Sequence, residues 1–187
     1  MFLLNEYFNL VNDFFINNVI GKIILSIISS FIFILLLLKT MRPKLKISEK
    51  ACYSEIDGIK YYVFKIVNMS YYDLYDIRIK LTRKTPYLAN KGSKINYQLN
   101  DLNLSSNHED HFAKFKWKKG YGDHALLLRT DHDLESDIRD NDISVRLTIT
   151  ARHGLTNLTR IKSQDFNSIN QIFKEKEFKF GRSLDVL

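Results

Sequence analysis

The 187-residue sequence contains few of the residue types on which many active sites depend. Its single cysteine, Cys52, can form no disulfide within one chain and no paired-cysteine metal site. Its 7 glycines form neither a glycine-rich phosphate loop nor a nucleophile elbow. A chain without disulfides is typical of a reducing cytoplasm. The sequence therefore offers none of the common motifs of nucleotide hydrolysis or serine-hydrolase chemistry.

The histidines and carboxylates do not form a recognisable site either. They cluster at residues 108–111 (HEDH), 123–124 and 131–133. Such side chains suit zinc. The first cluster lies in the polar run SSNHEDH, however, where we expect a solvated loop without the context of a metal motif. We predict no catalytic residue, metal ion or cofactor, and we expect a binding protein rather than an enzyme.

One long apolar stretch stands out. Val19–Leu38 is a run of 20 residues with a single charge, Lys22. At about 1.5 Å per residue, a helix of this length spans the hydrocarbon core of a bilayer, roughly 30 Å. Core helices of soluble proteins are usually shorter and striped, whereas residues 31–38 are apolar on every side. The stretch therefore predicts a transmembrane helix.

Basic residues are concentrated on one side of this span. None precedes it, and the remainder of the chain from residue 39 carries a net charge of +8. The positive-inside rule then places the C-terminal domain in the cytoplasm and the short N-terminus outside. Pro43 ends the helix, so residues 39–43 are a short junction. The basic residues that follow the span most closely are Lys39, Arg42, Lys44, Lys46 and Lys50.

The first 18 residues are less apolar than the span. Apolar and polar side chains alternate there with helical spacing. We expect an amphipathic helix lying in the membrane interface, or a continuation of the transmembrane helix above the membrane. Asn17, Asn18 and Gly21 are natural places for a bend between the two pieces.

Within the span, four polar side chains share one helical face. In one interpretation, the serines bond to their own helix and the lysine reaches the head groups. In the other, the face packs against further copies, because Ser26 and Ser30 form a small-xxx-small pair, with Lys22 near a water-filled pore. The residues of this face are Lys22, Ser26, Ser29 and Ser30.

From residue 44 onward the hydrophobic period changes from helical to two. About eight or nine short strands alternate with turn residues, which predicts a mainly antiparallel all-β domain over residues 44–187, either a barrel or a sandwich. Residues 131–142 predict a short helical or irregular insert. The expected strands lie at about 44–48, 58–68, 74–83, 94–99, 111–117, 124–130, 142–152, 156–163 and 177–180.

Candidate ligand-binding residues come from the basic strands and from residues 113–124. That segment interleaves lysines with aromatic rings, as a nucleotide site does. A half-buried strand with solvated lysines shows the same alternation, and lysines near a membrane also attract anionic lipid. The candidates are Arg78, Lys80, Trp117, Lys118, Tyr121, Arg129, Arg146 and Arg152.

The whole arrangement resembles a known family. A short membrane anchor that leads through RPKLKISEK (42–50) into an antiparallel β domain is similar to the transmembrane β-barrel effectors of bacterial anti-phage signalling, CBASS and related systems. The resemblance implies that the barrel binds a cyclic oligonucleotide and that the spans assemble and disrupt the bacterial inner membrane. The better-known members have two spans, whereas this sequence predicts one.

Two classes of function follow. The first is a nucleotide-gated effector that forms homo-oligomers in the lipid bilayer. Its ligand must bind the assembled state more tightly than the resting one. The second is a membrane-tethered adaptor whose β domain recruits a protein partner, for example through a sheet edge.

Overall fold

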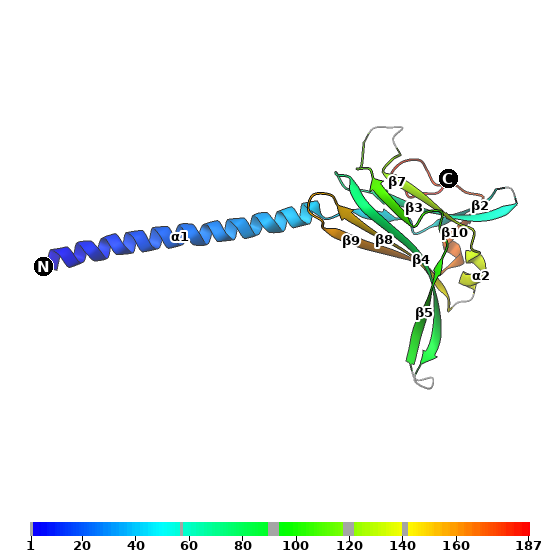
Figure 1. The fold of residues 1–187 in the computed structure, drawn as a ribbon, viewed down its shortest axis with the longest axis horizontal. Coiled ribbons are helices and arrows are strands. Elements are labelled where there is room, and N and C mark those ends of the chain that lie inside the picture. Colours follow the sequence, from blue (N-terminus) through cyan, green and yellow to red (C-terminus); the bar gives the residue numbers. More distant parts are fainter. Residues whose placement is uncertain (1, 57, 90–93, 118–121, 140–141) are drawn as a thin grey trace. The chain divides into compact units, whose positions relative to one another are not determined.

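The computed structural model describes residues 2–56, 58–89, 94–117, 122–139 and 142–187. It divides into two compact units, Met1–Met41 and Arg42–Leu187 (Figure 1). The first unit is helical, and the second contains the strands. The predicted class, an N-terminal apolar helix followed by a mainly antiparallel β domain, is confirmed.

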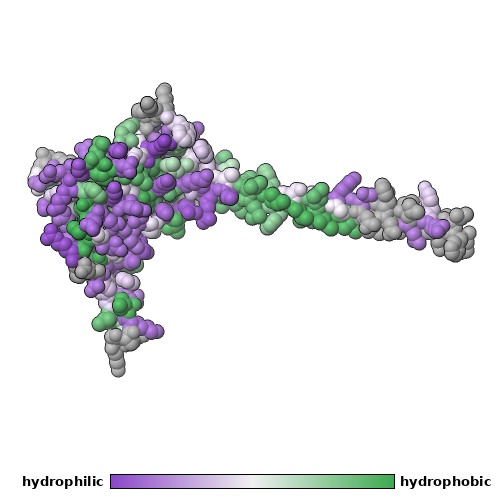
Figure 2. Space-filling model, turned by 180° about the vertical axis from the view of Figure 1, so that it is seen from behind, coloured by the Kyte–Doolittle hydropathy of each residue, from purple (hydrophilic) through white to green (hydrophobic). Residues whose placement is uncertain are grey.

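Helix α1, Phe2–Met41, is continuous. Residues 2–18, for which we expected either an interfacial amphipathic helix or a continuation of the transmembrane helix, lie in the same helix as the apolar segment that follows them. Its segment Asn18–Met41 is long and apolar enough to cross a membrane, and none of its most apolar window is buried. This segment is the apolar stretch of the helix in Figure 2.

The β domain contains two five-stranded sheets. Neighbouring strands are antiparallel except for β10 and β2, which run parallel. Sheet A contains β1 (Leu45–Ile47), β2 (Ala51–Ile56), β3 (Ile59–Asn68), β7 (Ala125–Thr130) and β10 (Ile172–Lys174). Sheet B contains β4 (Leu74–Ala89), β5 (Lys94–Leu102), β6 (His108–Phe112), β8 (Ser144–His153) and β9 (Thr159–Phe166).

The two sheets share one hydrophobic core. Alternate residues of the central strands β3, β4 and β8 point into it and are almost fully buried. Phe64 of sheet A meets Phe166 of sheet B with ring centroids 5.0 Å apart. Over the described residues the sheets do not close on each other, so the domain is a two-sheet structure and the barrel alternative is wrong.

The C-terminal segment contacts the second face of β3. Lys65 is buried on that face and donates a hydrogen bond from Nζ to the carbonyl of Lys179. Burial lowers the pKa of Lys65. Phe178, which lies beneath the same ammonium group, forms an isolated bridge with Val186. Strand β3 is therefore covered on both sides, as its two apolar faces predict.

Several local expectations need correction. The run expected as a polar loop, residues 105–111, contains most of β6, a strand that pairs with β4. Of the strand expected at 111–117, only residues 111–112 are in a strand. Strands β2 and β10 were not expected, and β4 continues six residues beyond the predicted end to Ala89. The expected insert contains helix α2, Leu134–Arg139. Further along the chain, a short 3-10 helix, η2, covers Ile169–Gln171.

The extra length of β4 produces a projecting hairpin. Residues 85–89 pair only with β5, because the pairing of β4 with β8 ends at Lys84. Figure 1 shows this hairpin extending away from the rest of both sheets. We call the described residues 85–89 and 94–98, together with the pair Lys84 and Leu99 at their base, the arm. Pro86 fits here because a strand with one free edge tolerates the loss of a backbone donor.

His124 is a buried histidine without a polar partner for its ring among the described residues. Its ring is 2% exposed and packs edge-on against Phe115, 5.2 Å between centroids. Among the described residues neither ring nitrogen has a hydrogen-bond partner. Burial lowers the pKa of His124, and the nearby Lys65 and Lys116 lower it further, while Asp123 opposes them. The folded domain therefore favours the neutral ring.

We predict that the domain loses stability as the pH falls below about 6.5, the ordinary pKa of histidine. Below that value His124 binds a proton in the unfolded chain but stays neutral in the folded domain. The free energy of unfolding therefore falls, by at most about 1.4 kcal/mol per pH unit. Urea unfolding at pH 7.5, 6.5 and 5.5 measures this slope. His124→Phe should flatten it, and an unchanged slope in that variant would contradict the assignment.

Candidate ligand-binding face of sheet B

The outward side chains of β4 and β8 form one continuous surface. Residues directly opposite each other in an antiparallel pair point to the same side of the sheet. Arg78 lies opposite Thr150, and Lys80 lies opposite Thr148. We define the sheet-B face as Arg78, Lys80, Arg146, Thr148, Thr150 and Arg152. Four of the eight predicted ligand residues are thus on neighbouring strands.

A bulge in β4 places a carboxylate among these cations. Asp76 has φ 48°, a left-handed conformation that aspartate tolerates better than most residues, where the β4–β8 register shifts. Arg78 donates to both of its oxygens, at 3.1 and 3.3 Å. His108 Nε2 lies 3.3 Å from Oδ1, and Arg152 Nη2 lies 3.7 Å from Oδ2. The hydrogen bond from Arg78, supported by the other two groups, lowers the pKa of Asp76.

The other two cations of this face also contact carboxylates. Lys80 Nζ lies 3.0 Å from Asp101 Oδ1. Arg146 donates two hydrogen bonds to Asp165, at 2.6 and 2.7 Å, and they hold the pKa of Asp165 below its usual range. The predicted basic surface is therefore a surface of mixed charge. An anionic ligand would have to draw the cations away from these carboxylates.

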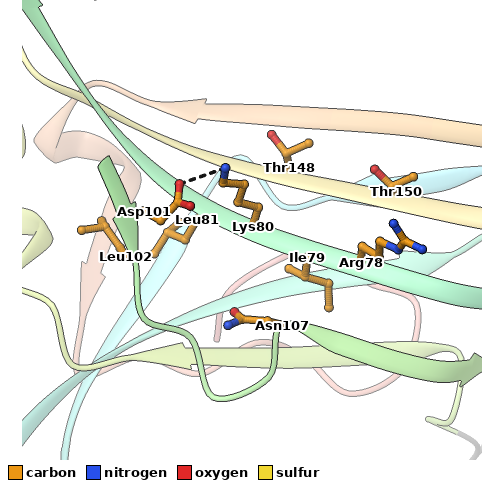
Figure 3. Close-up of a pocket in the computed structure, with 9 residues that line it drawn as sticks. All are labelled: Arg78, Ile79, Lys80, Leu81, Asp101, Leu102, Asn107, Thr148 and Thr150. Atoms are coloured by element: carbon orange, nitrogen blue, oxygen red, sulfur yellow. Dashed lines mark ion pairs between the residues drawn. The ribbon is translucent and has the colours of Figure 1, made fainter. Parts of the chain in front are cut away.

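A cavity of about 370 Å³ opens beside Arg78 and Lys80. The cavity lies where β5 ends and the chain leaves the edge of β4. Asn107, which follows β5, still contacts β4: Ile79 N donates a hydrogen bond of 2.8 Å to the carbonyl of Asn107. Figure 3 shows Lys80 and Asp101 directed toward each other, with Thr148 and Thr150 on the next strand. Guanidinium, ammonium and hydroxyl donors of this kind suit phosphate oxygens.

The same face continues onto the arm, where its character changes from charged to apolar. Leu88 lies opposite Ile95, and Leu99 lies opposite Lys84, whose ammonium sits 4.8 Å above the ring of Tyr97. Figure 2 shows hydrophobic residues on this projecting hairpin. We define the arm face as four side chains that are each between 50% and 70% exposed: Leu88, Ile95, Tyr97 and Leu99.

The arm face is the feature that the sequence analysis missed. Ile95, Tyr97 and Leu99 alternate with polar residues, and this pattern is typical of a strand with one buried face. In the structure that face is open. The signal that could have revealed it is Pro86, which argues against a central position for this part of β4.

The remaining predicted ligand residues lie elsewhere. Arg129 is on β7 in sheet A. Trp117 follows β6, with its ring against Phe115 and 4.9 Å from the guanidinium of Arg182. Lys118 and Tyr121 lie outside the described residues. The predicted aromatic and basic site therefore does not form around the sheet-B face from the side chains that the structure describes.

The histidines of the polar clusters named from the sequence lie beside carboxylates. His111 lies 3.7 Å from Asp73, and His132 lies 2.7 Å from the buried Asp137, which also contacts Arg83 at 3.1 Å. Within the described ranges, no group of three or more histidine, cysteine or acidic side chains is placed to hold a metal ion.

The helix face predicted from the sequence lies on the membrane-capable segment of α1. Its members Lys22, Ser26, Ser29 and Ser30 are all exposed, as are the apolar residues around them.

Comparison with known proteins gives little further guidance. No family model matches the sequence, and no curated protein matches it. Among solved structures, the sporulation control protein Spo0M from Bacillus subtilis matches with a TM-score of 0.38 and 13% sequence identity, over 73% of this chain. The match covers 50% of the Spo0M chain, so this chain corresponds to about half of that protein.

Proposed function

We propose that this chain is a membrane-anchored protein that acts by assembling with further copies of itself, through the arm face of its β domain. The observation that carries the proposal is the exposure of Leu88, Ile95, Tyr97 and Leu99 on a hairpin that projects from the domain. Contiguous exposed apolar side chains on a soluble domain mark a site of interaction. A two-stranded hairpin is also only marginally stable by itself, so a partner would stabilise the arm.

A second copy fits this surface for two reasons. The arm face is apolar and uncharged, with Leu88 on β4 and the other three side chains on β5, so it can pack against its own image across a two-fold axis. The cations of the adjoining sheet-B face are paired with neighbouring carboxylates, such as Lys80 with Asp101, so this region can meet its own image without a large excess of one charge. The patch is small, and anchorage by Asn18–Met41 would confine the copies to one surface and raise their effective concentration.

Assembly of the β domains would bring the anchors together. Ser26 and Ser30 would then lie where small side chains allow two helices to approach closely. In this proposal the anchors lie in a bacterial inner membrane with the β domain in the cytoplasm, and their clustering disrupts the bilayer, as expected of an anti-phage effector. The basic residues after the span support this orientation.

We predict that a cysteine placed on the arm face will cross-link two copies in membranes. In Leu99→Cys, a short bis-maleimide should give a band at twice the chain mass. The native Cys52 should stay silent, because burial raises its pKa to about 11 and keeps the thiol protonated. The measurement is denaturing electrophoresis after cross-linking.

The matched control is Leu127→Cys, which replaces a leucine that is half exposed on β7 of sheet A, away from the arm. It should cross-link far less than Leu99→Cys. Equal yields from both positions would contradict assembly through the arm. A single cross-linked band of another mass, containing a stoichiometric second protein, would favour the membrane-tethered adaptor.

The cavity beside Arg78 and Lys80 favours a second function, gating of this assembly by a cyclic oligonucleotide. Phosphate oxygens would replace Asp76 and Asp101 as partners of the two cations. A ligand that binds the assembled state more tightly than single copies would shift the equilibrium toward assembly.

We predict opposite effects of two substitutions at this cavity on binding of cyclic oligonucleotides to the full chain in lipid nanodiscs. Arg78→Gln should weaken binding by about tenfold, the loss of one charge-assisted hydrogen bond. Asp101→Asn should strengthen it, since Lys80 loses its competing carboxylate. Titration calorimetry against a panel of cyclic oligonucleotides measures both, with Arg129→Gln on sheet A as the control. Absence of heat with every ligand would rule out the gate and leave ligand-independent assembly.

A further inference from the structure

We propose that one end of the β domain is a lipid-docking face, which rests on anionic head groups of the bilayer that α1 crosses. The inference depends on the membrane anchorage proposed above. Three exposed apolar or aromatic side chains form the centre of this face: Tyr71 (69% exposed), Trp117 (71%) and Leu155 (90%). Basic side chains accompany them: Lys44, Lys114 and Arg182.

The chain itself limits how far this end lies from the anchor. Three residues separate Met41, the last residue of α1, from Leu45, the first of β1. At no more than about 3.6 Å per residue, Lys44 lies within roughly 11 Å of the helix end. Lys44 N donates to Ser70 Oγ at 2.8 Å, and Met69 N donates to Lys44 O at 2.7 Å. Lys44, three residues after the end of α1, is thus hydrogen-bonded to the loop that follows β3.

Tyr71 is the exposed residue of that loop. The ammonium of Lys44 lies 5.9 Å from the centre of its ring. The neighbouring Ser70 is buried and holds the loop by its hydrogen bond to the backbone of Lys44. Tyr71 therefore lies close to the point where the chain leaves the anchor.

The β8–β9 turn is fixed beside the same loop. The ring of Tyr72 meets the ring of His153 edge-on, with centroids 4.1 Å apart. His153 is buried, and its Nδ1 accepts a hydrogen bond of 3.2 Å from Thr156 N. The turn held in this way carries Leu155 at its exposed tip.

Trp117 is tied to the same loop through Phe115. Phe115 N donates to Ser70 O at 2.9 Å, and the Phe115 ring packs edge-on against Trp117 at 4.9 Å. The guanidinium of Arg182 lies 4.9 Å from the indole ring, within cation–π distance. Tyr71 thus lies in the loop at residues 68–72, and the segments that carry Leu155 and Trp117 both contact that loop.

This composition fits a lipid surface better than water or a folded partner. Tryptophan and tyrosine favour the head-group region of a bilayer, where an apolar ring and a polar atom are both satisfied. Each lysine or arginine near an anionic surface adds to the electrostatic attraction. Strand β4 begins beside this face at Leu74 and rises about 50 Å to Ala89. The arm face is therefore far from the docking face and stays available for assembly.

Trp117 is the single tryptophan of the chain, so its fluorescence tests the inference directly. The full chain is reconstituted into vesicles of phosphatidylcholine and phosphatidylglycerol, and flotation shows whether it inserts. Lipids brominated near the head group should quench Trp117 strongly, and iodide should quench it several-fold less than a free tryptophan amide. Tyr71→Ser combined with Leu155→Ser should weaken the bromolipid quenching, because two contacts with the lipid are lost.

The matched control is Leu88→Ser, which removes an exposed leucine from the arm and should leave the quenching unchanged. A chain that floats with the vesicles but shows no bromolipid quenching overturns the docking face and leaves the anchor standing. A chain that does not float overturns both. Quenching that persists in the double variant but falls in Leu88→Ser would place the arm at the lipid and contradict the inference.

Discussion

The apolar surface of Asn18–Met41 cannot remain in water, and the rest of the molecule depends on where that surface is buried. Its isoleucine, leucine and phenylalanine side chains are exposed on all sides of the helix. Each such residue favours the centre of a bilayer by about 0.3–0.6 kcal/mol. Lys22 lies one turn inside the segment, where its long side chain can reach the head groups. A membrane is the environment that satisfies this helix without a protein partner.

The short junction turns this anchor into a constraint on the β domain. Lys44 directly follows the junction, and its backbone N–H and carbonyl each form a hydrogen bond with the loop after β3. The loop begins after Asn68, the last residue of β3. Asn68 is fully buried, and its side-chain amide donates hydrogen bonds to the carbonyls of Phe112 and Ala113. A change in the arrangement of β domains would therefore reach the anchor through few flexible bonds. The β domain then has three surfaces in our account: the proposed docking face near the junction, the ion-paired face of sheet B, and the apolar arm.

The core of the fold could be predicted from the sequence, since the period of two reports which residues share a face. Ile77, Ile79 and Leu81 alternate with polar residues in an expected strand and are almost fully buried. The same rule failed at Ile95 and Leu99, because periodicity shows that a face is apolar but not whether anything covers it.

The charged surface was predicted in composition and not in geometry. Arg78, Lys80, Arg146 and Arg152 were among the predicted ligand residues, and the pairing of β4 with β8 places them on one face of sheet B. Their carboxylate partners depend on strand register and on the bulge at Asp76, which neither composition nor spacing reveals. The short polar strand β6 was missed for a related reason. Its sequence HEDHF has the composition of a loop, and it pairs along its length only with β4.

The central claim is that anchored copies assemble through their arms, and counting the copies in single complexes tests it most directly. The full chain, fused to a fluorescent protein and diluted in a supported lipid bilayer, can be counted by stepwise photobleaching. The account predicts two or more steps in most spots, and mainly one step when Leu88 and Ile95 are both replaced by serine. Single steps from the unaltered chain, at densities where a known dimer shows two, would contradict it.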